Sequence, residues 1–122
     1  MKSLKITIVV ATLFAAAPVL AHEAKGPNGG RIVDAGNYHV ELVVKAGQVD
    51  VFLTDSSDKP VTASGFKGTA ILMAGGKAQR IPLEFSDTAK LAGKSPVSLP
   101  ADVKGVVQLT TPDGKTVQGQ YK

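Results

Sequence analysis

The chain has 122 residues, 14 Lys and Arg side chains against 10 Asp and Glu, a formal net charge of +4, and no Cys. The lack of Cys excludes disulfides, thiolate metal sites and cysteine nucleophiles. The charges alternate in sign without a basic run, and aromatic residues make up only 5% of the chain, so a nucleic-acid partner is not expected.

Residues 1–21 have the pattern of a cleaved secretory signal peptide. Two lysines lie among the first five residues, an uncharged apolar run follows over residues 6–20, and Val19-Leu20-Ala21 suits a signal peptidase. The apolar run is shorter than the roughly 20 residues that span a bilayer. We therefore expect cleavage after Ala21 and export to the periplasm of a protein of about 100 residues. No membrane span is expected in this mature chain.

The segment after the predicted cleavage site, residues 22–30, is rich in Gly, Pro and Asn and is predicted to be a flexible N-terminal segment. From residue 31 to residue 122, short alternating segments are separated by Gly, Pro, Asn, Asp and Ser. This pattern is typical of an all-β domain. No helical period of 3.6 residues appears in it.

The clearest hairpin pattern pairs residues 38–45 with residues 48–54 across Ala46-Gly47. A two-residue loop places alternate residues of both strands on one face. Six apolar side chains then face the core: Val40, Leu42, Val44, Val49, Val51 and Leu53. The opposite, mostly polar face carries His39, Glu41, Val43, Lys45, Gln48, Asp50, Phe52 and Thr54.

A second hairpin is predicted where residues 69–73 meet residues 79–85 across Gly75-Gly76, with Ile81, Leu83 and Phe85 pointing inward. A third is predicted to turn at the Asp-Gly pair of residues 113–114, a strong hairpin signal.

The segments between these hairpins complete the predicted fold. Residues 55–60 are expected to form a turn, and residues 90–100 a looser crossing with room for one short strand. Together the segments predict a single small β-sandwich over residues 31–122, immunoglobulin-like in architecture, with about seven or eight mainly antiparallel strands.

One stretch carries a family resemblance. The run GPNGGRIVDAGNYHVELVVKAGQVDVFLTDSSDKPV, residues 26–61, combines a Gly-Gly turn, an ELV strand, a strand that ends in an acidic turn, and a following KPV. It resembles small exported bacterial β-domains and the N-terminal β-module of heavy-metal efflux adaptor proteins of the resistance-nodulation-division type. The resemblance implies a link to metal efflux. Where such modules often read His-Gly-Gly, this chain has Asn28-Gly29-Gly30.

The two histidines are the candidate metal ligands. A histidine at a free N-terminus can chelate Cu(II) through its α-amino nitrogen and Nδ1, and a second imidazole completes a tetragonal nitrogen set. Cleavage after Ala21 makes His22 that terminal residue, and His39 is the other histidine of the chain. Glu23 or Glu41 can add an axial oxygen, and Met73 can serve Cu(I). The candidate metal residues are therefore His22, His39 and Glu41.

Other interpretations of these residues stay open. His39 and Glu41 alone can form a weaker metal site, or neither histidine has a metal role. In the latter interpretation His22 is an ordinary terminal residue and His39 is a solvated side chain on the outer face of a strand.

A further candidate site is a small apolar contact patch made by Val43 and Phe52 on the otherwise polar face of the first hairpin. The alternative is that a loop such as residues 90–100 packs over these two side chains.

The sequence does not favour an enzyme. No nucleophile-elbow sequence occurs, and residues 55–58 lack the ligand spacing of a calcium loop. We expect a non-enzymatic periplasmic accessory or binding protein in copper or other heavy-metal handling, with a periplasmic or efflux-system partner and Cu(II) as the candidate cofactor. The alternative is a protein-interaction or structural β-module with no metal role.

Overall fold

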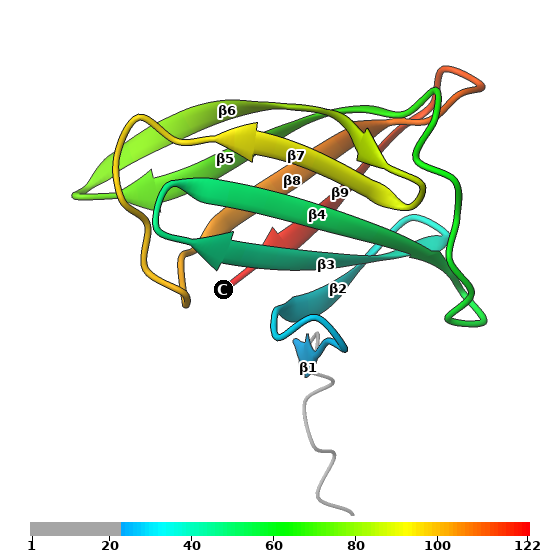
Figure 1. The fold of residues 1–122 in the computed structure, drawn as a ribbon, viewed down its shortest axis with the longest axis horizontal. Coiled ribbons are helices and arrows are strands. Elements are labelled where there is room, and N and C mark those ends of the chain that lie inside the picture. Colours follow the sequence, from blue (N-terminus) through cyan, green and yellow to red (C-terminus); the bar gives the residue numbers. More distant parts are fainter. Residues whose placement is uncertain (1–22) are drawn as a thin grey trace, which may run out of the picture.

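A computed structural model describes residues 23–122, and in this part of the chain the fold is all-β with no helix, as the sequence predicts (Figure 1). Nine strands form one antiparallel sheet that curls into a half-barrel. The strands are β1 (Ala24–Lys25), β2 (Arg31–Ala35), β3 (Tyr38–Lys45), β4 (Gln48–Asp55), β5 (Lys67–Ala74), β6 (Lys77–Asp87), β7 (Lys90–Lys94), β8 (Gly105–Thr110) and β9 (Thr116–Tyr121). Within the described part of the chain, no helix is long and apolar enough to cross a membrane.

The strand order explains the curl of the sheet. The order is β1-β2-β3-β4-β7-β6-β5-β8-β9, so the chain leaves β4, starts again three strands away at β5, and returns through β7 to the free edge of β4. The far end of the sheet then approaches its beginning, because β9 packs against β2. All strands are hydrogen-bonded into one sheet in place of the two predicted sheets, and their order differs from that of an immunoglobulin domain.

The predicted first hairpin is confirmed in register. Val40 lies opposite Leu53, Leu42 opposite Val51, and Val44 opposite Val49. The second hairpin turns at the predicted Gly75-Gly76 pair, with φ values of 58° and 77°. Both glycines have the positive φ that a two-residue hairpin turn needs. The predicted short strand within residues 90–100 is β7, which pairs with both β4 and β6.

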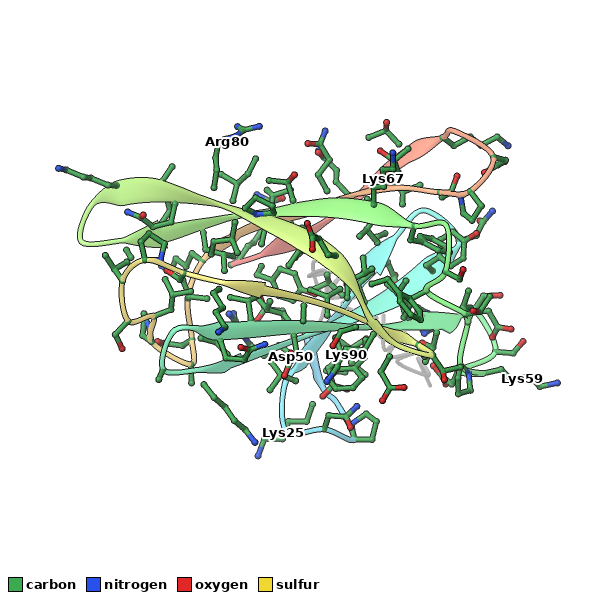
Figure 2. All side chains as sticks on the ribbon, turned by 45° about the horizontal axis from the view of Figure 1, so that its top comes forward. Lys25, Asp50, Lys59, Lys67, Arg80 and Lys90 are labelled. Carbon is green, nitrogen blue, oxygen red and sulfur yellow. The ribbon has the colours of Figure 1, made fainter. Side chains whose placement is uncertain are left out.

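The core lies inside the curl of the sheet and takes side chains from both halves. Its fully buried members include Val40, Val49, Val51, Leu53, Leu72, Ile81, Leu91, Val107 and Leu109. Figure 2 shows Lys67 and Arg80 on the outer side of the β5–β6 half, and Asp50 and Lys90 on the outer side of the other half.

One inward assignment from the sequence is wrong. Ile81 and Leu83 are buried as expected, but the side chain of Phe85 is 55% exposed. Phe85 borders an irregularity in the pairing of β6 with β7, where the register shifts between Phe85 and Asp87. The extra residue, Ser86, follows Phe85, so Phe85 ends the regular stretch at the point where a bulge bends the strand.

The C-terminal strand is fastened to the N-terminal strands by Tyr121. This phenol is buried, and its hydroxyl donates a hydrogen bond to the carbonyl of Val40 over 2.7 Å. The guanidinium of Arg31 lies 5.3 Å from the centre of the Tyr121 ring. Arg31 also pairs with Glu23 over 3.1 Å and donates to the carbonyl of Val103. These contacts hold β9 against β2 and β3 and close the curl of the sheet.

The variant Tyr121→Phe is expected to weaken the dependence of stability on alkaline pH. Burial raises the pKa of Tyr121, so the folded chain keeps a proton that the unfolded chain releases near its ordinary pKa of about 10. The stability from this group is therefore complete below about pH 10 and falls above it by about 1.4 kcal/mol per pH unit. Urea unfolding of both proteins at several pH values above neutrality measures the difference in slope.

At neutral pH the same variant should be less stable by about 1 kcal/mol, because the carbonyl of Val40 loses its partner. Parallel stability curves for the two proteins above about pH 10 would contradict a proton retained on the buried phenol.

Candidate functional site

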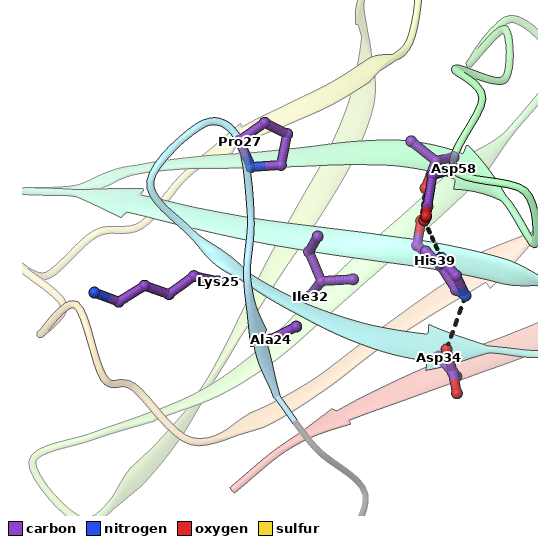
Figure 3. A pocket seen from close by; sticks show the side chains of 8 residues that line it. Ala24, Lys25, Pro27, Ile32, Asp34, His39 and Asp58 are labelled. Carbon is purple, nitrogen blue, oxygen red and sulfur yellow. Dashed lines mark hydrogen bonds and ion pairs between the residues drawn. The ribbon is translucent and has the colours of Figure 1, made fainter.

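A cleft opens on the outer face of the sheet beside β2 and β3 (Figure 3). It has a volume of about 500 Å³. Its walls come from β1 and the following turn, from β2, β3 and β4, and from the loop after β4. The lining residues are Ala24, Lys25, Pro27, Ile32, Asp34, His39, Thr54 and Asp58.

The register of the strands brings the polar residues of the cleft together. Asp34 on β2 lies directly opposite His39 on β3, and His39 lies directly opposite Thr54 on β4. Residues that face one another across an antiparallel pair project from the same side of the sheet. Asp34, His39 and Thr54 therefore form one row across three strands, on the side away from the core.

Asp58 reaches the same row from the loop after β4. Its backbone has a φ of 62°, and its amide donates to the carbonyl of Asp55 over 3.0 Å. The carboxylate of Asp55 accepts the amides of Lys59 and Ser57 over 3.0 Å and 2.8 Å, and these two bonds lower the pKa of Asp55. The loop is thus tied by its own backbone into a shape that turns Asp58 toward β3.

His39 has a carboxylate at each of its ring nitrogens. Nδ1 lies 2.8 Å from Oδ1 of Asp58, and Nε2 lies 3.2 Å from Oδ1 of Asp34 (Figure 3). The His39 side chain is 27% exposed, whereas both carboxylates are at least 80% exposed. A neutral imidazole has one N–H and can donate to only one of the two partners.

The apolar side of the cleft is separate from this charged end. Ala24, Pro27 and Ile32 line the part beneath the N-terminal turn, and Lys25 extends away from His39 (Figure 3). The charged end therefore combines one imidazole and two carboxylates in an open position on the sheet, an arrangement that attracts small cations.

Glu41, a predicted metal residue, is engaged elsewhere. It lies two residues beyond His39 on the same face of β3, but it is only 3% exposed. Its Oε2 accepts the amides of Asn28 and Gly30 over 3.0 Å and 2.9 Å, and its Oε1 accepts Nδ2 of Asn28 over 2.8 Å. Both oxygens are thus occupied by the turn over residues 26–30. We call this arrangement the Glu41 cradle.

The turn of the cradle is closely fitted. The amide of Gly26 donates to the carbonyl of Gly30 over 2.9 Å, and a Cβ atom on Gly26 would lie 2.1 Å from the Glu41 carboxyl carbon. Residues 24–30 thus form β1 and a turn packed on the Glu41 carboxylate. They belong to the segment that the sequence predicts to be flexible.

The remaining predicted metal residues have other surroundings. His22 lies outside the described residues. Met73 is on β5, four strands away from β3 in the sheet, and is 45% exposed. Within residues 23–122 no group of three His, Asp or Glu side chains converges on one point that can hold a metal ion. This agrees with the positions of Asp34 and Asp58, which take opposite nitrogens of His39.

The predicted contact residues Val43 and Phe52 do not form an open patch. Val43 is 7% exposed, and it packs so closely beneath Gly30 that a Cβ atom there would lie 2.8 Å from its Cγ2. Phe52 is half-buried, with Nζ of Lys90 5.8 Å from its ring centre. The turn of the Glu41 cradle thus packs on Val43, and Lys90, from the segment 90–100, packs on Phe52.

Two members of the charged end, Asp34 and Asp58, were not among the predicted site residues. The signal for Asp34 was available, because a short β2–β3 turn at Gly36-Asn37 places it opposite His39. The sequence offered no such signal for Asp58, because its position depends on how the loop after β4 folds back.

No protein-family model, no curated protein sequence and no solved structure matches the chain. The site therefore has to be interpreted from its own geometry.

The variant Glu41→Ala is expected to destabilise the fold by about 2–4 kcal/mol, because three hydrogen-bond donors of the turn lose a charged acceptor. Urea unfolding monitored by far-UV circular dichroism measures the loss. Glu84→Ala, which removes an exposed glutamate on β6, is the matched control and should change stability by less than about 0.5 kcal/mol. Equal effects of the two substitutions would refute a stabilising role for the cradle.

Proposed function

We propose that the protein is a non-enzymatic, exported accessory protein that binds Cu(II) at the cleft around His39 and serves heavy-metal handling in the periplasm. The observation that carries this proposal is the placement of His39, in an open cleft, with a carboxylate facing each ring nitrogen. Imidazole and carboxylate are both suitable ligands for divalent copper, and neither needs the thiolates that this chain lacks.

The predicted N-terminus supports the choice of copper. Ala24 lines the same cleft as His39, and His22 precedes it by two positions in the sequence. Two residues span at most about 7 Å, which brings an N-terminal His22 within reach of the cleft. In this proposal the signal peptide is removed after Ala21, and the α-amino group and ring of His22 supply nitrogen ligands that complete a tetragonal set.

The partner in this proposal is a periplasmic or efflux-system protein. Its support is the resemblance of residues 26–61 to the N-terminal β-module of heavy-metal efflux adaptors. The proposal also keeps the description of the domain as sandwich-like, because the two halves of the curled sheet enclose a single core between them. The position where the adaptor modules often have histidine is Asn28, whose side chain here serves the Glu41 cradle.

The test is a Cu(II) titration by calorimetry and EPR of protein whose N-terminus is verified by mass as His22. One equivalent should bind with nitrogen hyperfine structure in the EPR spectrum. His39→Gln should weaken binding by more than about 100-fold, since it removes a ligand and not merely an orienting partner. One extra residue before His22 should also weaken binding, because it removes the terminal chelate.

The control is Gln79→Ala, a substitution on β6 outside the cleft, which should leave Cu(II) binding unchanged. Weak, non-stoichiometric binding by the unaltered protein would refute the proposed function. In that case the alternative of an interaction or structural module with no metal role would replace it.

A further inference from the structure

We propose that Asn28 is a site of covalent modification: its side-chain amide is lost by deamidation, and the carboxylate that results releases the N-terminal turn from Glu41 irreversibly. Asn28 is followed by Gly29. Asparagine is one of the chemically labile residues, and it reacts fastest before a glycine, because a glycine has no side chain to hinder the attack on the amide. The inference concerns the Glu41 cradle and does not depend on metal binding.

The reaction needs only water as a co-reactant. The backbone nitrogen of Gly29 attacks Cγ of Asn28, a bond forms between these two atoms, the Cγ–Nδ2 bond breaks, and ammonia leaves with the proton of the attacking amide. Water then adds its hydroxyl to one of the two carbonyl carbons of the cyclic imide, the bond from that carbon to the ring nitrogen breaks, and the nitrogen takes the remaining proton. The products are aspartate and isoaspartate, whose main chain is longer by one carbon. Nothing is oxidised or reduced.

The turn of the cradle requires both residues of this labile pair. Gly29 has a φ of 83°, a backbone conformation that favours glycine, and no atom lies within 4 Å of the place that a Cβ would take. Asn28 donates to Glu41 twice, through its backbone N–H and through its side-chain amide. The other asparagine of the chain, Asn37, precedes a tyrosine. The labile pair therefore lies where the fold has a use for each of its members.

The closed turn protects Asn28 from the reaction. The N–H of Gly29, which carries the attacking nitrogen, donates to the carbonyl of Gly26 over 3.1 Å. Nδ2 of Asn28, the leaving nitrogen, donates to Oε1 of Glu41 over 2.8 Å. Both bonds have to break before the nitrogen of Gly29 can reach Cγ. Asn28 and Gly29 are exposed, so water has access to the pair once the turn opens. Deamidation therefore proceeds from the locally opened turn.

The products cannot close the turn in the same way. Aspartate at position 28 has an oxygen in place of Nδ2, the atom that lies 2.8 Å from Oε1 of Glu41. Two carboxylates in such contact repel each other when both are ionised. Isoaspartate also lengthens the backbone between the N–H groups of residues 28 and 30, which donate to the same oxygen of Glu41. Loss of ammonia makes the change irreversible.

Release of the turn alters two surfaces. Gly30 packs closely over Val43, which is only 7% exposed while the turn is closed. Lys25 and Pro27 form part of the wall of the cleft (Figure 3). The conversion therefore uncovers an apolar side chain and opens one wall of the cleft. The modified chain presents a different surface from the unmodified chain, and it cannot return to the earlier one.

The first experiment follows the ageing of the purified chain by mass spectrometry, in buffer and in urea. Trypsin digestion places Asn28 in the peptide of residues 26–31 and Asn37 in that of residues 32–45. The mass change from an amide to a carboxyl group should accumulate at Asn28 ahead of Asn37, and faster in urea, where the turn is open. A rate at Asn28 no higher than at Asn37 in urea, or an equal rate at Asn28 in both solutions, would overturn the proposal.

The protection by the cradle has its own variant. Glu41→Gln should raise the rate at Asn28 in folded protein, because a glutamine turns an N–H donor toward one of the donors of the turn. Far-UV circular dichroism checks that this variant is folded. Glu84→Gln, at an exposed glutamate on β6, is the matched control and should leave the rate unchanged. An equal rate in folded Glu41→Gln and in the control would contradict the protection.

The second experiment tests the release of the turn. Asn28→Asp should let trypsin cut the native protein after Lys25 about 10–100-fold faster, because loss of one charge-assisted hydrogen bond raises the population of the opened turn by that factor. Aged protein, separated from the unmodified chain by ion exchange, should be cut faster in the same way. Asn37→Asp adds the same charge at an exposed position and should not change the rate. Equal cleavage of aged and unmodified protein would show that deamidation leaves the turn closed and would overturn the proposal.

Discussion

The buried carboxylate of Glu41 is the constraint on which the N-terminal part of this structure depends. A carboxylate removed from water is costly unless charged hydrogen bonds replace its hydration. Here two backbone amides and one side-chain amide supply them, all from the turn over residues 26–30. The charge therefore fixes the turn on the sheet. This turn also positions β1 and the preceding Glu23, which pairs with Arg31 beside Tyr121.

This chain of contacts connects sequence elements that are far apart. Asn28 lies 13 residues before Glu41, and Tyr121 lies 81 residues after Val40, the residue whose carbonyl it binds. The chemistry of an asparagine side chain suits position 28. An amide at this position can donate to the carboxylate while its own backbone N–H does the same. Both oxygens of Glu41 are thus occupied by hydrogen bonds from the turn.

The sequence predicts the local part of this architecture and not the long-range part. Alternation within residues 38–54 is sufficient to give the register and the inward face of the first hairpin, because a short turn leaves one way to pair the strands. It does not say which strand joins β4 from the other side, and β7 comes from about 40 residues further along. A sandwich of two sheets was expected, whereas one curled sheet forms. The strand pairs that join its parts, β4 with β7 and β5 with β8, are not adjacent in sequence, so alternation could not predict them. For the same reason alternation identified His39 as an outward residue but not Asp58 as its neighbour.

The two sides of His39 are built with unequal rigidity. On the Nδ1 side, the loop bonds around Asp55 fix Asp58 beside the ring. On the Nε2 side, Asp34 lies opposite His39 in the β2–β3 pair, and its side chain is 83% exposed. Strand β2, which carries Asp34, lies between β1 and β3 in the sheet. This part of the sheet therefore depends on the Glu41 cradle, which fixes the turn between β1 and β2 on β3.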